Sequence, residues 1–157
     1  MAGATAVLYK GGTVVKALRY QLGSLERHTT YEVELTGILL GMWMVGQEPE
    51  ASTASIKADS QAAALSLHSH RAGPGSYLLD EIRELSVSLK DQSLSDLRLR
   101  VSWVSGHNGV AGNERADLEA KDAAAGSSST DRELPSLLRS APCRAASRQP
   151  SSISGHH

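Results

Sequence analysis

The chain has 157 residues, with 16 Lys and Arg against 17 Asp and Glu, a formal net charge of −1. This length suits one domain with a tail, and the near-neutral charge argues against a strong sequence-independent grip on nucleic acid. The single cysteine, Cys143, excludes an internal disulfide or a multi-cysteine zinc site, so we expect an intracellular protein of the nucleus or cytoplasm. No apolar run reaches about 18 residues, so no membrane-spanning helix or membrane partner is expected.

The first predicted elements are two strands over 4–10 and 13–22. They flank Gly11-Gly12, a two-residue signal for a β-hairpin. Next, Thr29 or Thr30 is the predicted cap of a helix that runs to about residue 45. The apolar residues of this helix follow the i, i+3, i+4, i+7 spacing of one helical face, at Leu35, Ile38, Leu39 and Met42.

The rest of the folded part alternates short strands and helices. A strand over 54–58 precedes a short helix over 61–67, and a long helix with apolar residues from 78 to 89 follows the Gly-Pro-Gly break at 73–75. A half-buried strand over 97–103 comes next, and then a helix that Asn113 can cap and that ends at Gly126. Strand–helix–strand crossovers imply that the last two strands are parallel. We therefore predict an α/β mixed sheet with helices packed on it.

The composition changes at Gly126. Residues 127–157 are rich in Ser, Pro and Arg and have too few apolar side chains to offset the entropy of ordering. We predict a folded domain over 1–126 and a mostly flexible tail over 127–157. Within the tail, the leucines at 134, 137 and 138 form one short apolar patch that could dock.

Three acidic residues have settings that suggest chemistry. Glu34 lies in the first turns of its helix, on a face with the small residues Gly37 and Gly41, Asp59 ends a buried type of strand, and Asp117 lies one turn into the last helix. Strand ends and helix starts that meet at one rim form the usual ligand crevice of a mixed α/β sheet. Three carboxylates there would repel one another unless a cation neutralised them, and an oxygen-only ligand set suits Mg²⁺ or Mn²⁺. Two such metal ions bound roughly 3.5–4 Å apart catalyse the hydrolysis of phosphodiesters in many nucleases.

Each residue also has a plain structural interpretation, and the pattern alone does not choose between them. Glu34 could complement the helix dipole. Asp59 could cap the following helix, and Asp117 could pair with Arg115 or Lys121. Similarly, His107 could be an ordinary exposed loop histidine. Only the joint placement of these residues favours a site, and periodicity does not establish that they converge.

A longer string of residues resembles a known family. The segment 101–121 has a strand that ends near Trp103, a Gly106-His107 loop, and Asn113-Glu-Arg-Ala-Asp117 opening a helix. It is similar to the C-terminal signature of type 1 ribonuclease H domains. Supporting segments are Ile56-Lys-Ala-Asp59-Ser-Gln61 and Tyr31-Glu-Val-Glu34-Leu35, which resemble the family's strand ending in Asp-Ser and its helix with a catalytic Glu.

Within this family, the chain resembles the RNase H domains of fungal non-LTR retrotransposons. Ala6-Val-Leu-Tyr-Lys-Gly-Gly followed by Leu18-Arg-Tyr-Gln-Leu-Gly carries this likeness, together with Leu134-Pro-Ser-Leu-Leu-Arg and Pro142 in the tail. By resemblance, such domains depend on a neighbouring reverse transcriptase domain for affinity.

The resemblance implies hydrolysis of the RNA strand of RNA–DNA hybrids with Mg²⁺ or Mn²⁺. It makes Glu34, Asp59 and Asp117 both catalytic residues and metal ligands, and His107 a loop histidine that moves protons or helps product leave. It also implies five strands in the order 3-2-1-4-5. Three further residues are expected to help bind the hybrid through its shallow minor groove: Arg27, Gln61 and Asn113.

The chain departs from the family pattern at its beginning. The family has a fourth carboxylate, an Asp of Asp-Gly-Ser on a first, central strand, but no Asp precedes Asp59 in this sequence. We therefore expect the central strand and the bridging ligand to be missing and the hydrolase to have little or no activity. The alternative is a catalytically inactive, retroelement-derived remnant that acts as a nucleic-acid-binding or interaction module.

Overall fold

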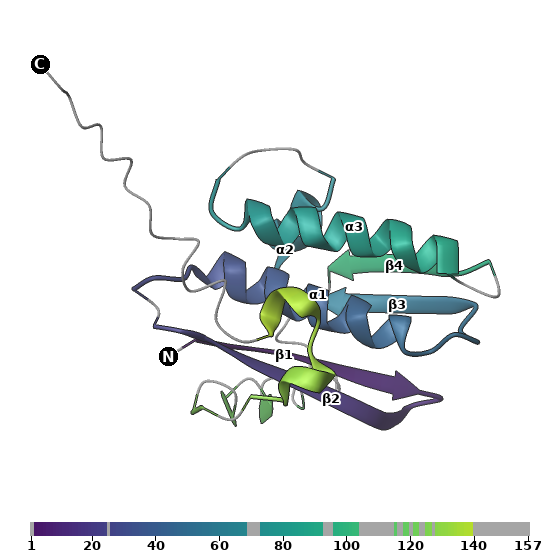
Figure 1. Cartoon of the computed structure of the whole chain (residues 1–157), viewed down its shortest axis with the longest axis horizontal. Helices are drawn as coiled ribbons and strands as arrows, with labels where there is room; N and C mark the ends of the chain where they lie inside the picture. Colours follow the sequence, from purple (N-terminus) through teal and green to yellow (C-terminus); the bar gives the residue numbers. More distant parts are fainter. Residues whose placement is uncertain are drawn as a thin grey trace, which may run out of the picture.

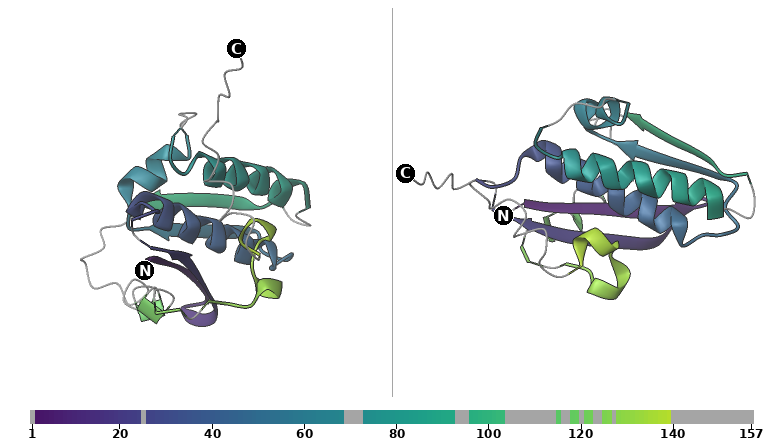
Figure 2. Two further views of the ribbon diagram at one scale, coloured as in Figure 1. Left: turned by 60° about the vertical axis from the view of Figure 1, so that its left-hand side comes forward. Right: turned by 45° about the horizontal axis from the view of Figure 1, so that its top comes forward.

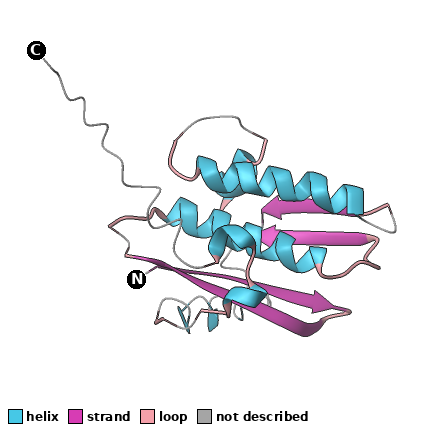
Figure 3. Ribbon diagram, viewed as in Figure 1, coloured by secondary structure: helices cyan, strands magenta, loops and turns pink. Residues whose placement is uncertain are grey.

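The computed structural model describes residues 2–24, 26–68, 73–92, 96–103, 115, 118, 119, 121, 122, 125, 126 and 128–139. Its helices and strands follow the predicted order (Figures 1 and 3). They are β1 (Ala2–Lys10), β2 (Thr13–Gly23), α1 (Thr30–Gly46), β3 (Thr53–Ala58), α2 (Gln61–Ser66), α3 (Ser76–Gln92), β4 (Arg98–Trp103) and two short 3-10 helices, Asp131–Glu133 and Ser136–Leu138. Of the predicted helix over 113–126, residues 115, 118, 119, 121 and 122 are helical, residues 125 and 126 form a turn, and the others lie outside the described residues.

The predicted hairpin is confirmed. β1 and β2 pair antiparallel, from Ala2 opposite Gly23 to Lys10 opposite Thr13. Gly11 and Gly12 form the turn with φ values of 56° and 79°. Two successive residues at positive φ make the turn whose twist matches that of paired strands, and glycine adopts this conformation without steric cost.

Helix α1 begins at a capping box. The Thr29 side chain accepts from the backbone N–H of Glu32 at 3.2 Å, and Glu32 Oε2 accepts from the backbone N–H of Thr29 at 2.8 Å. These two bonds satisfy N–H groups that a helix start leaves without partners. They fix the first turn of α1, and with it the position of Glu34 in the next turn.

The second sheet is parallel, as the crossover rule predicted. β3 and β4 pair from Thr53 opposite Arg98 to Ala58 opposite Trp103. The connection between them includes α2 and α3. Of the predicted apolar stripe of α3, Leu78, Ile82 and Leu89 are buried and Leu85 is half-buried. The α/β class, with an antiparallel pair, a parallel pair and flanking helices, is confirmed.

The four described strands form two separate two-stranded sheets, and α1 packs on both (Figures 1 and 2). A Cβ on Gly37 would lie 3.1 Å from the carbonyl oxygen of Thr5 in β1, and a Cβ on Gly41 would lie 3.7 Å from Ile56 in β3. Gly37 thus lets the helix backbone approach β1 closely, whereas at Gly41 the helix lies over β3 at an ordinary contact distance. Within the described ranges no strand joins β1 to β3, which is the place of the central strand that we expected to be missing.

Residues 128–139, which we call the strap, lie against β2 and α1. The Ser128 and Ser129 hydroxyls accept from the backbone N–H groups of Gln21 and Arg19, both at 2.9 Å. Further along the strap, Leu134 and Leu138 are buried in the core at 1% and 5% exposure. The apolar patch expected in the tail therefore docks, whereas the predicted boundary at residue 126 remains a prediction.

Trp43 of α1 makes two contacts with the strap. The indole N–H of Trp43 in α1 donates to the carbonyl of Glu133 at 2.9 Å, and the guanidinium of Arg139 lies 5.8 Å from the Trp43 ring centre. A cation at this distance from an indole ring is attracted by the ring's electron density.

None of the helices in the described part is long and apolar enough to span a membrane.

Candidate functional site

Asp59 stands at the carboxyl end of the parallel sheet. The β3–β4 ladder ends at the pair of Ala58 and Trp103, so Asp59 is the first residue beyond it, and it is exposed. The helix that follows is capped by Ser60, whose hydroxyl accepts from the backbone N–H of Ala63 at 3.2 Å. The interpretation of Asp59 as the helix cap is therefore wrong, and its carboxylate is not used for this purpose.

Glu34 lies toward the same end of the molecule. It shares the face of α1 that bears Gly37 and Gly41, and Gly41 lies over Ile56 of β3. Glu34 is seven residues back from this contact along α1, and Asp59 is three residues forward along β3. At ~1.5 Å per helical residue and ~3.3 Å per strand residue, both are about 10 Å away. Because α1 and β3 run in opposite directions (Figure 1), both are displaced toward the same end.

A second glutamate near the start of α1 has a different role. Glu32 is 7% exposed, and besides the capping box its carboxylate lies near two further groups. His28 Nδ1 is 3.7 Å from Glu32 Oε2, and the Tyr77 hydroxyl donates to Glu32 Oε1 at 3.5 Å. Glu32 is also the acidic residue of the first turn of α1. The dipole-complementing function that we considered for Glu34 is thus performed by Glu32.

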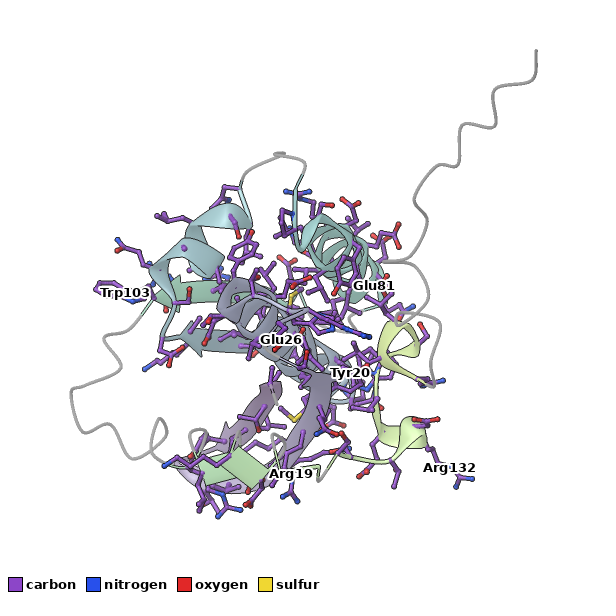
Figure 4. The ribbon with its side chains drawn as sticks, turned by 90° about the vertical axis from the view of Figure 1, so that its left-hand side faces the viewer. Arg19, Tyr20, Glu26, Glu81, Trp103 and Arg132 are labelled. Carbon is purple, nitrogen blue, oxygen red and sulfur yellow. The ribbon has the colours of Figure 1, made fainter. Side chains whose placement is uncertain are left out.

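Two of the residues expected to bind substrate lie on the surface at this end. Arg27 is exposed in the turn before α1, and its backbone N–H donates to the carbonyl of Ser24 at 3.1 Å. Gln61 is exposed at the first position of α2, two residues after Asp59. Figure 4 views this end of the molecule, with Glu26 of the same turn in front and Trp103 projecting outward beside α2. Gln61 thus lies next to the strand end that carries Asp59, and Arg27 lies in the turn before α1, the helix that carries Glu34.

His107, Asn113 and Asp117 lie outside the described residues, so their expected roles stay predictions. The described part of their predicted helix is attached to β2 by Glu119, which is 6% exposed. Glu119 Oε2 lies 3.2 Å from Arg19 Nε, and Glu119 Oε1 lies 2.8 Å from Arg115 Nη2. Arg115 thus binds Glu119, although we had considered it as a partner for Asp117.

Sequence reasoning missed Glu119 because a helical glutamate ordinarily faces solvent. Its partner on β2 is 100 residues earlier in the chain, so no local pattern links them. A helix–strand ion pair of this kind leaves no periodic signal in the sequence. In this respect Glu119 differs from Glu34 and Asp59, whose element ends could be predicted locally.

The described residues contain no group of three or more His, Cys, Asp or Glu side chains that could hold a metal ion. The predicted ligand set includes Asp117, so this observation does not test it. A cleft of about 570 Å³ opens elsewhere, between the hairpin turn and the segment that joins α1 to β3. Lys10 and Glu48 of its lining form an ion pair. The cleft lies at the start of β3, the opposite end from Asp59, and does not belong to the candidate site.

The chain was compared with models of known protein families. The RNase H family matches residues 1–125. The matched range contains both sheets, the helices α1, α2 and α3, and every residue of the candidate site. Because this match covers most of the chain and the fold agrees with it, the chain belongs to the RNase H family.

Proposed function

We propose that this domain hydrolyses the RNA strand of RNA–DNA hybrids endonucleolytically, with Glu34, Asp59 and Asp117 as metal ligands. Membership of the RNase H family supports ribonuclease H activity on such hybrids, and the family is generally Mg²⁺-dependent. The observation that carries the assignment of residues is the displacement of Glu34 and Asp59 toward the same end of the molecule, at the end of β3 and the start of α1.

The donor set fits a hard divalent cation. Carboxylate oxygens from an exposed Asp59 and a half-buried Glu34 leave room for water ligands, which Mg²⁺ retains when it binds proteins. When bound, the metal would activate water and stabilise the leaving oxygen of the phosphodiester. His107, which follows β4 in the sequence, would move protons or assist product release.

Substrate contact is proposed at the same end. Arg27, Gln61 and Asn113 would bind the sugar–phosphate backbone and minor groove of the hybrid, where 2′-hydroxyls distinguish RNA from DNA. With a net charge of −1, the chain has little general attraction for polyanions. A neighbouring reverse transcriptase domain, as in fungal non-LTR retrotransposons, would provide the missing affinity, and we propose that origin for the domain.

Low turnover is part of the proposal. Glu34, Asp59 and Asp117 are three carboxylates, which hold one ion more readily than a bridged pair. Hybrid cleavage with Mg²⁺ and with Mn²⁺ tests this expectation, using Asp59→Asn as the control. Weak cleavage that Asp59→Asn abolishes supports the assigned site. Robust turnover that Asp59→Asn abolishes would show that three carboxylates suffice.

The alternative function is an inactive module that binds nucleic acid or a protein partner. The two separate two-stranded sheets formed by the described strands favour it. Hybrid binding measured by fluorescence anisotropy, without cleavage in either metal, would support the alternative. Cleavage that is unaffected by Asp59→Asn would remove Asp59 from the site.

A further inference from the structure

A side-chain hydrogen bond holds the main chain at Asp59. The indole N–H of Trp103 donates to the carbonyl oxygen of Asp59 at 3.2 Å. Because the β3–β4 ladder ends at Ala58 and Trp103, Asp59 lies just past the last paired residue. A backbone carbonyl at this position needs a partner, and the indole provides one where the ladder stops.

Asp59 is exposed and lies between the end of β3 and the start of α2. Ser60 caps α2 immediately after it, so the chain turns from strand to helix at this point. Trp103 itself is 48% exposed and projects from the end of β4 (Figure 4). A tryptophan so exposed contributes less to the core than a buried one would. Its N–H group, however, donates a hydrogen bond to the backbone carbonyl of Asp59.

We propose that Trp103 is a positioning residue for the Asp59 carboxylate, an inference that rests on the proposed function of this site. The hydrogen bond fixes the plane of the peptide group between Asp59 and Ser60. The fixed peptide restricts the direction in which the Asp59 side chain leaves the backbone. Mg²⁺ requires near-octahedral ligand geometry, so its affinity depends on that direction.

The test compares two tryptophans that make the same kind of bond. Trp103→Phe removes the N–H that Asp59 uses. Trp43→Phe removes an equivalent N–H, which donates to the Glu133 carbonyl at 2.9 Å on the strap. In the full chain, titration calorimetry with MgCl₂ is expected to show affinity weakened about tenfold by Trp103→Phe, the lower range for groups that orient metal ligands. Trp43→Phe is expected to keep the wild-type affinity.

Equal affinities for wild type and Trp103→Phe, or the same weakening in both variants, would overturn the proposal. If Trp103→Phe does not fold, benzothienylalanine at position 103 provides an isosteric ring without the N–H and applies the same criterion. These outcomes separate positioning from a general loss of stability, because Trp43→Phe removes a comparable bond elsewhere.

A second readout does not depend on metal. The ¹⁵N heteronuclear NOE of the Asp59 and Ser60 amides, measured without Mg²⁺, is expected to fall in Trp103→Phe and to stay unchanged in Trp43→Phe. If the wild-type chain binds no Mg²⁺, the proposed function fails, and this NOE then decides whether Trp103 orders Asp59. An unchanged NOE in Trp103→Phe would overturn the positioning role.

Discussion

Glu119 joins Arg19 of β2 to the helical residues that follow β4 in the chain. Its Oε2 atom is 3.2 Å from Arg19 Nε, as an ion pair without hydrogen-bond geometry, and its Oε1 atom accepts from Arg115 Nε at 2.9 Å. One buried carboxylate thus binds two guanidinium groups. Since Asp117 precedes Glu119 by two residues in the predicted helix, this ion pair is expected to anchor the helix of the proposed third ligand.

Glu119→Ala is expected to lower the free energy of unfolding by about 1–2 kcal/mol. Removing one partner of a fully buried pair costs more than this, but the Arg19 and Arg115 side chains are 33% and 47% exposed and are solvated after the loss. Asp122→Ala is the matched control, because this carboxylate contacts the same Arg19 at 3.4 Å but is 53% exposed. The control should cost less than about 0.5 kcal/mol. Urea unfolding measures both, and equal costs would contradict the anchoring role.

Glu32 and Glu34 should respond oppositely to amide substitution. Glu32→Gln leaves one side-chain oxygen for two donors, the Thr29 N–H and the Tyr77 hydroxyl, and removes the negative charge of the first turn. It should cost about 1 kcal/mol of stability, with Mg²⁺ affinity unchanged. Glu34→Gln should weaken Mg²⁺ binding and hybrid cleavage while the unfolding midpoint changes less than in Glu32→Gln. Thermal unfolding and Mg²⁺ calorimetry on both variants provide the comparison. A loss of Mg²⁺ binding in Glu32→Gln alone would exchange the two roles.

Gly37 and Gly41 of α1 should differ in their tolerance of a methyl group. A Cβ at Gly41 would make an ordinary 3.7 Å contact with Ile56, whereas one at Gly37 would press on the Thr5 carbonyl at 3.1 Å. Alanine in a helix is favoured over glycine by about 0.8–1.0 kcal/mol. Gly41→Ala should therefore gain most of that stability, and Gly37→Ala should gain less or lose. Urea unfolding of both variants tests this order, and a greater gain at Gly37 would contradict the close approach of α1 to β1.

The sequence predicted those parts of the fold that depend on local chemistry. Gly11-Gly12 predicted the hairpin turn, and helical spacing predicted the buried face of α1. The spacing did not predict that Leu40 and Met44, on other faces of α1, are also buried at 0% and 2% exposure. A helix is buried all round when elements cover every side, and α1 contacts both sheets, α3 and the strap. Which distant segments cover a helix is not encoded in its own periodicity.

The candidate site follows the same division. The strand end at Asp59 and the helix start near Glu34 could be predicted from local patterns, but the assignment of caps could not. Ser60, rather than Asp59, caps α2, and Glu32, rather than Glu34, serves the first turn of α1. Neighbouring residues with similar capping ability compete for one cap, and backbone geometry decides between them. The structure therefore leaves Asp59 and Glu34 without these two structural explanations.

Acid should weaken the first turn of the strap. Hydrogen bonds from the Thr130 side chain and backbone hold the pKa of Glu133 below its ordinary value. A carboxylate with a lowered folded-state pKa contributes stability that is present above its unfolded pKa and is lost as the pH falls through the folded pKa. The indole N–H resonance of Trp43, which binds the Glu133 carbonyl, should report this loss below about pH 4. Glu133→Gln should remove the dependence, and an unchanged titration in that variant would contradict the assignment.

The strap should be part of the folded domain rather than an appendage. Leu134 is 1% exposed, so Leu134→Ala should cost about 2–4 kcal/mol by creating a cavity in the core. Ser136→Ala, at an exposed position of the same segment, is the control and should change stability little. A chain that ends at Gly126 loses the whole strap and should unfold at lower urea than one that ends at Arg139, because the core beneath Leu134 and Leu138 is opened. Equal midpoints for the two truncations would instead place the domain boundary at residue 126.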